Sequence, residues 1–81
     1  MNEKIDYGDA VEIEGDAPTK YHPGEGGSTC GYRIIESEKE SNVTEEAIGT
    51  ALWLIELPNG DAFEIPEKYL KIMQKGDNDK P

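Results

Sequence analysis

The stretch from Thr50 to Met73, TALWLIELPNGDAFEIPEKYLKIM, constrains the fold more than any other part of the chain. In its first half, every second residue is apolar and would lie on one face of a strand. Leu52 and Leu54 make the opposite face apolar as well. Such a pattern predicts a strand that bends across both halves of a small barrel and is covered on both sides. One face of this predicted strand carries Ala51, Trp53, Ile55 and Leu57.

The second half of the same stretch predicts a hairpin and a last strand. Residues 58–61, PNGD, favour a tight turn, because Asn-Gly tolerates left-handed backbone angles. Residues 62–65 return as a strand, which Pro66 ends because proline has no N–H for the ladder. Residues 66–69 predict one 3-10 turn, followed by a strand that contains Leu70 and Ile72.

The first half of the chain predicts two strands separated by a long loop. Residues 10–14, AVEIE, alternate between apolar and acidic side chains. Residues 15–27 contain two prolines and four glycines, which predicts a loop and excludes a helix or a central strand there. Residues 28–36 predict the next strand, with a bulge at Gly31 and an inner face of Cys30, Tyr32 and Ile34.

These elements predict an all-β fold, a small SH3-like barrel of about five antiparallel strands over residues 7–73. Flexible tails are expected at residues 1–6 and 74–81. Between the second and third strands, Asn42 and Glu45 have capping-box spacing, which predicts a helical turn over residues 43–48. The alternative is an open antiparallel sheet on which residues 41–49 pack as a helix.

Charge limits the classes of partner. The 81 residues include 8 Lys and Arg against 18 Asp and Glu, a net charge of −10. Such a field repels nucleic acid and anionic membranes, whose binding depends on Lys and Arg. The same field attracts a basic protein, which is the partner that we expect. We also expect the free chain to be a monomer. A second reading is that the acidity only keeps a small protein soluble.

The reactive residues are few. Cys30 is the only cysteine, so no internal disulfide can form, and a reducing, cytoplasmic location is expected. The chain shows no signal peptide and no apolar run of membrane-spanning length. His22 and Cys30 lack further His or Cys for a zinc site, and a lone inward cysteine is usually a buried apolar residue. We therefore expect no catalytic residues, no metal, no cofactor and no enzymatic activity.

Aromatic and acidic residues predict the contact surface for a partner. In SH3-like barrels the long loop and the 3-10 turn lie on the rim of one groove, where Tyr7 could join two further tyrosines. Tyrosine supplies contact area at little entropic cost, and carboxylates pair with Lys or Arg. Trp53 is expected in the core. The predicted partner-binding residues are Tyr21, Glu25, Tyr69, Glu67, Asp16 and Glu64.

Several short motifs carry a family resemblance: residues 8–13 (GDAVEI), the Gly26-Gly27 pair, and ELPNGDAFEIPEKYL at residues 56–70. With these, the chain resembles small bacterial SH3-like domains and is similar to the SH3-like immunity proteins of polymorphic-toxin systems. The resemblance implies a cognate toxin, whose basic active-site cleft the protein would cover.

A second resemblance is to KOW-type modules and to SH3-like subunits of photosynthetic or redox complexes, which also open with G-D-x-V. KOW modules commonly carry basic loops, whereas the loop here sets Lys20 and His22 against Asp16 and Glu25. This resemblance implies the alternative function, a structural accessory subunit of a larger enzyme or redox complex.

Overall fold

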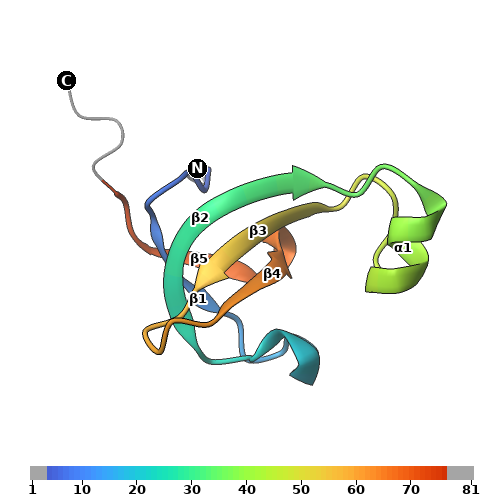
Figure 1. Cartoon of the computed structure of the whole chain (residues 1–81). Coiled ribbons are helices and arrows are strands. Elements are labelled where there is room, and N and C mark those ends of the chain that lie inside the picture. The colour runs from blue at the N-terminus through green and yellow to red at the C-terminus, as the bar shows by residue number, and fades with distance from the viewer. Residues whose placement is uncertain (1–3, 77–81) are drawn as a thin grey trace.

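The computed structural model describes residues 4–76 and confirms the predicted all-β, SH3-like barrel. Five antiparallel strands form one sheet in the order β4-β3-β2-β1-β5, so the first strand lies beside the last. Figure 1 shows the strands curving around one core, with α1 standing apart from them. The elements in chain order are β1 (Ala10–Ile13), η1 (Thr19–Tyr21), β2 (Gly26–Ile34), α1 (Glu38–Thr44), β3 (Ala51–Glu56), β4 (Ala62–Pro66), η2 (Glu67–Tyr69) and β5 (Leu70–Gln74).

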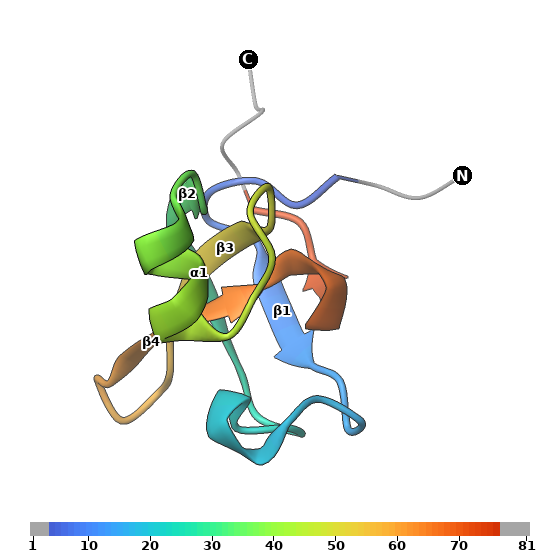
Figure 2. The ribbon, with the colours of Figure 1, turned by 90° about the vertical axis from the view of Figure 1, so that its right-hand side faces the viewer.

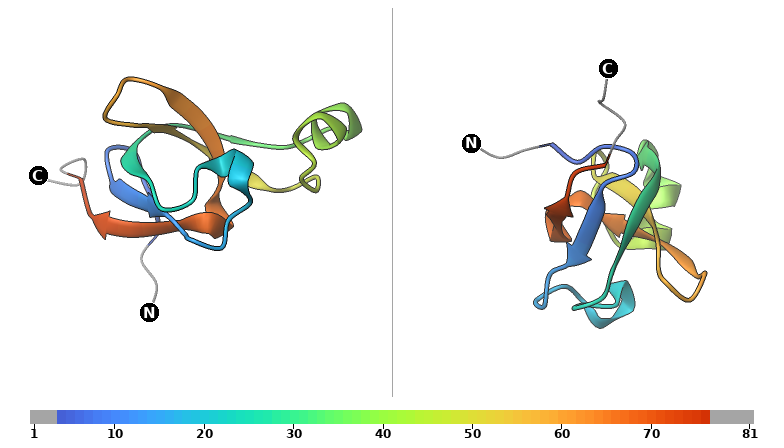
Figure 3. Two further views of the ribbon diagram at one scale, coloured as in Figure 1. Left: turned by 90° about the horizontal axis from the view of Figure 1, so that it is seen from below. Right: turned by 90° about the vertical axis from the view of Figure 1, so that its left-hand side faces the viewer.

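The long strand β2 joins the two halves of the barrel. It pairs with β1 only through residues 26–28, and with β3 from Ser28 to Ile34. The register shifts between Thr29 and Gly31, which confirms the predicted bulge. A bulge bends a strand and increases its twist, and Figure 3 shows β2 curving in this way beside its neighbours.

The core lies between the curved strands, and the predicted inner face of β3 contributes much of it. Trp53 is 4% exposed and Ile55 is fully buried. Leu52, on the opposite face of β3, is also buried, which confirms that this strand is covered on both sides. The main buried cluster consists of Val11, Ile13, Ala17, Tyr21, Trp53, Ile55, Leu57, Ile65 and Leu70.

The bulge overturns the prediction that Cys30 faces inward. Thr29 lies opposite Ile55 and is buried, whereas Cys30 is exposed. The extra residue of a bulge has no partner on the facing strand, so Thr29 and Tyr32, and not Cys30, lie opposite the inner-face residues of β3. Tyr32 lies opposite Trp53, and it therefore projects from the same side of the sheet as Trp53.

The predicted loop over residues 15–27 is too long at its C-terminal end. Gly26 and Gly27 belong to β2, and residues 19–21 form the 3-10 turn η1. A Cβ on Gly27 would collide with the backbone carbonyl of Glu56. The glycine pair thus allows two strands to approach closely. The sequence did not show this role, because glycines are equally typical of a loop.

The helix between β2 and β3 starts earlier than predicted. Ser37 is its N-cap, and the Ser37 hydroxyl accepts a hydrogen bond from the Glu40 amide (3.2 Å). Glu45 ends the helix in the left-handed conformation (φ 64°), at the centre of the predicted turn over residues 43–48. Figure 2 shows α1 in front of the barrel, and none of its residues is buried. The helix therefore does not pack on an open sheet, as the alternative fold requires.

Asp9 holds the two ends of the described chain together. Its carboxylate accepts hydrogen bonds from the amides of Asp6 (2.9 Å) and Gly76 (2.7 Å) and from Lys75 (2.8 Å). Asp6, Lys75 and Gly76 lie within the segments predicted to be tails, whereas Asp9 lies within the predicted barrel. Residues 1–3 and 77–81 lie outside the described part. No helix within residues 4–76 is long and apolar enough to cross a membrane.

Candidate functional site

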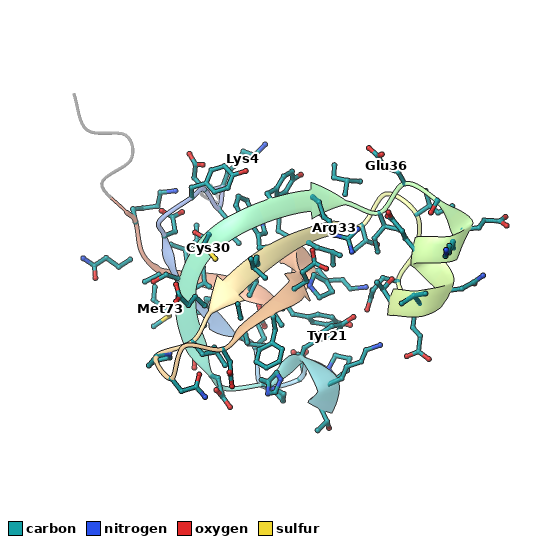
Figure 4. All side chains as sticks on the ribbon, viewed as in Figure 1. Lys4, Tyr21, Cys30, Arg33, Glu36 and Met73 are labelled. Carbon is teal, nitrogen blue, oxygen red and sulfur yellow. The ribbon has the colours of Figure 1, made fainter. Side chains whose placement is uncertain are left out.

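Two of the predicted site residues, Tyr21 and Tyr69, lie against one another. Their ring centroids are 5.7 Å apart, and they come from η1 and from η2. Lys20 and Lys68 each place an ammonium group 5.2 Å from the centroid of one of these rings. The predicted meeting of the long loop and the 3-10 turn is therefore present. Tyr21, which is labelled in Figure 4, is only 8% exposed, so most of its side chain is buried.

A buried carboxylate from the α1–β3 connection completes the tyrosine pair. Glu46 is 8% exposed, accepts a hydrogen bond from the Tyr21 hydroxyl (2.8 Å) and forms an ion pair with Lys68 (3.2 Å). Burial raises the pKa of Tyr21, and the bond to Glu46 raises it further, so the hydroxyl remains a donor. The hydrogen bond to Glu46 also raises the pKa of Lys68. This network fastens the connection to the barrel.

A shallow pocket of about 220 Å³ lies beside this network, between η1, α1 and strands β3 and β4. The charged side chains around this pocket are held in ion pairs. Lys20 pairs with Glu45 (2.8 Å), and Arg33 pairs with Glu64 (2.6 Å). The walls combine Lys20, Tyr21, Val43, Thr44, Leu52, Phe63 and Glu64.

Glu64, which is one of the predicted site residues, is committed to an intramolecular contact. Arg33 donates from Nε to Oε2 (2.6 Å) and from Nη2 to Oε1 (3.0 Å), and it also reaches Glu40 (3.2 Å). These contacts raise the pKa of the Arg33 guanidinium, with Glu64 as the main cause. A partner would have to compete with Arg33 for the Glu64 carboxylate.

Asp16 and Glu25, by contrast, are exposed in the β1–β2 loop. The two arms of this loop run side by side, because the Ile13 amide donates to the Glu25 carbonyl (2.7 Å) and the Gly24 amide donates to the Ile13 carbonyl (2.8 Å). Glu14, next to Ile13, is exposed as well. The loop therefore presents several carboxylates at its base.

The remaining predicted residue, Glu67, belongs to a second cluster around Trp53. Its carboxylate accepts a hydrogen bond from the indole Nε1 (3.1 Å). Tyr7 contacts Trp53 edge to face (centroids 5.5 Å apart), and Tyr32 lies 4.6 Å from it. Tyr7 is thus placed against Trp53, and the structure does not bring it to the pair of Tyr21 and Tyr69.

The Trp53 cluster leaves apolar surface exposed at the end of β2. Tyr7 is 51% exposed, Tyr32 45% and Ile34 40%. We did not select Tyr32 and Ile34 from the sequence, because alternation placed them in the core. Glu46 was also missed, since no sequence pattern distinguishes it from its exposed acidic neighbours.

The acidic charge is unevenly compensated. Within residues 4–76, Lys20, Arg33, Lys68 and Lys75 form ion pairs with five carboxylates, two of which share Arg33. Three lysines remain, Lys4, Lys39 and Lys71. The carboxylates of the same range without an ion pair are Asp6, Glu12, Glu14, Asp16, Glu25, Glu36, Glu38, Glu56, Asp61 and Glu67.

Among the described residues, no group of three or more His, Cys, Asp or Glu side chains is placed to hold a metal ion. The His22 ring stacks on Phe63 (4.1 Å between centroids), whereas the Cys30 thiol donates to the carbonyl of Leu54 (3.5 Å). Comparisons with protein-family models, with curated proteins and with solved structures find no match for this chain.

Proposed function

We propose that this protein is a non-enzymatic binding module that captures a basic protein. The observation that carries the proposal is the uncompensated charge of the described part: ten carboxylates without an ion pair against three lysines. A field of one sign accelerates association with an oppositely charged partner and disfavours acidic ones. Exposed aromatic side chains beside the carboxylates add contact area for such a partner.

The exposed loop carboxylates and the aromatic cluster would have different roles. Asp16 and Glu25 are unpaired within the described chain and can attract cations over a distance of about one Debye length, roughly 8 Å at physiological salt. Tyr69 and Glu67 lie between the loop and Trp53, where a docked partner would meet them. Tyr21 and Glu64 support this surface through their bonds to Glu46 and Arg33.

The finer form of the proposal follows the resemblance to SH3-like immunity proteins. The basic partner would then be a cognate toxin, neutralised when the acidic protein covers its active-site cleft. A cytoplasmic meeting place is consistent with a single, exposed cysteine that is not needed for a disulfide.

A specific observation also favours the second candidate, a structural accessory subunit of a larger complex. Tyr7, Tyr32, Ile34 and Met73 are each at least 40% exposed, and a permanent interface would cover such side chains. An accessory subunit would expose this surface when isolated, so the free chain should self-associate or bind an apolar dye. A monomer that does neither would support the first candidate.

The test of charge capture uses a defined basic probe, the peptide Lys-Val-Lys-Val-Lys-Val-Lys, and its counterpart with Glu in place of Lys. We expect calorimetry to show binding of the lysine peptide that weakens more than tenfold between about 20 and 500 mM salt. The glutamate peptide should not bind. The double variant Asp16→Asn, Glu25→Gln should weaken binding about two- to fivefold. Lys71→Gln, which removes a positive charge instead of a negative one, serves as the control. Affinity that is independent of salt would contradict the proposal.

A further inference from the structure

The outer edge of β2 is unpaired where its exposed apolar side chains begin. β1 pairs with β2 only as far as Ser28, and two further hydrogen bonds join Thr29 to Gly8 and Asp9. From there to Ile34, β2 has a strand partner on one side only, which is β3. Within the described chain no other strand covers this edge.

Backbone geometry identifies the free groups on that edge. The Ile35 amide donates to the Thr50 carbonyl (3.0 Å), which points it toward the β3 side. Since backbone groups alternate along a strand, the N–H and C=O groups of Tyr32 and Ile34 point the other way. The next outward amide, that of Glu36, is already bonded to the Glu40 carboxylate (3.3 Å). The free edge therefore consists of Tyr32 and Ile34.

Within residues 4–76, this edge lacks the protection that natural edge strands usually have. Charged side chains, prolines or a covering segment normally prevent strand addition. Here Tyr32 and Ile34 are half-exposed and apolar, and the one charged residue between them, Arg33, is held on the opposite face by Glu64 and Glu40. Tyr7 is 51% exposed and, like Tyr32, packs on the buried Trp53, so it extends the apolar surface next to Tyr32.

We propose that the partner docks by adding an extended, basic segment as an antiparallel strand to the Tyr32–Ile34 edge of β2. This inference rests on the proposed function and names its contact site. The segment would bond its backbone to the free groups of Tyr32 and Ile34, in the manner of strand addition to an open sheet edge. Its apolar side chains would lie on Tyr7, Tyr32 and Ile34.

Charge decides the nature of the occupant. Glu67 beside Trp53, Glu36 at the end of the edge and Asp6 beside Tyr7 place carboxylates around the apolar surface. A second copy of this chain would bring its own net charge of −10 to the same edge. A basic segment gains from that field, whereas a second copy is repelled.

The first arm of the test methylates backbone nitrogens of the lysine–valine probe. In an antiparallel pair, valines opposite Tyr32 and Ile34 would direct their N–H groups at β2, and the lysines would direct theirs away. N-methylation of the valines should weaken binding at least tenfold, whereas N-methylation of the lysines, which leaves charge and side chains equal, should change it less than threefold.

The second arm changes the protein. Ile34→Pro removes the outward amide and leaves the bonds to β3 intact, since proline is tolerated where the N–H faces outward. Ile34→Ala shortens the same side chain and keeps the amide. We expect Ile34→Pro to bind the probe at least fivefold more weakly than Ile34→Ala, with both variants retaining the near-ultraviolet spectrum of a folded barrel.

The outcomes separate the two proposals. Equal effects of the two methylation patterns, with salt-dependent binding retained, would overturn strand addition and leave charge capture standing. A probe that does not bind at any salt concentration would overturn both. Dimers of the free chain that dissociate in Ile34→Pro would show a second copy as the occupant, which contradicts the basic segment. If Ile34→Pro fails to fold, the methylated peptides decide alone.

Discussion

At the scale of single residues, Asp9 shows how one carboxylate can close the barrel. It has no exposed surface, and its two oxygens accept the Gly76 amide on one side and the Asp6 amide and Lys75 on the other. Burial by itself disfavours the charged form, but these donors outweigh it, so the pKa of Asp9 lies below its ordinary value of 3.8.

We predict that Asp9→Asn destabilises the protein by about 2–3 kcal/mol near neutral pH, because an amide offers one acceptor oxygen where the carboxylate offers two. Since the folded-state pKa is depressed, the contribution is complete above the unfolded value and is lost as the pH falls through the folded one. Urea unfolding should therefore show the difference between wild type and Asp9→Asn shrinking below about pH 4. The exposed control Glu56→Gln should change stability by less than about 0.5 kcal/mol. An equal difference at every pH would contradict the assignment.

At the scale of elements, the sequence allowed the strands and a small SH3-like barrel to be predicted, because period-two alternation and the Pro, Asn and Gly turn signals are local. The bulge at Gly31 was also predictable, but its consequence was not. One extra residue exchanged the faces on its N-terminal side, so that Thr29, and not Cys30, shares with Tyr32 the side of β3 that carries Trp53 and Ile55. The open edge of β2 could not be predicted, because it depends on where β1 ends against β2.

The helix α1 was misplaced because two capping signals compete in the same segment. Ser37 with Glu40 and Asn42 with Glu45 have the same spacing, and the earlier pair is the one used. No residue of α1 is buried, so neither position was favoured by an apolar face that a periodicity argument could detect.

We predict that Ser37→Ala loosens α1 alone. Loss of the cap should cost about 1 kcal/mol within the helix and speed amide exchange of Ser41 and Glu45 roughly fivefold. Ser37→Asp, which keeps a capping oxygen, should behave as wild type. Exchange in β2 and β3, and binding of the lysine–valine peptide, should be unchanged in both variants. A parallel loss of protection in the barrel would show that α1 belongs to its cooperative unit.

At the scale of the whole molecule, the proposed function assigns attraction and recognition to different features. The carboxylates without ion pairs are spread over strands, loops and α1, so they set a general field rather than a specific site. The unpaired edge of β2, in contrast, is a short and directional feature beside Trp53. A partner would be drawn by the first feature and selected by the second.

Amide hydrogen exchange of the whole chain, with and without the lysine–valine peptide, tests this account most directly. In the free protein the amides of Tyr32 and Ile34 should exchange rapidly, and those of Arg33 and Ile35 should be protected by β3. Saturating peptide at low salt should protect Tyr32 and Ile34 at least tenfold, and high salt should reverse that protection. Protection of Tyr32 and Ile34 in the free protein, or rapid exchange that saturating peptide leaves unchanged, would contradict the account.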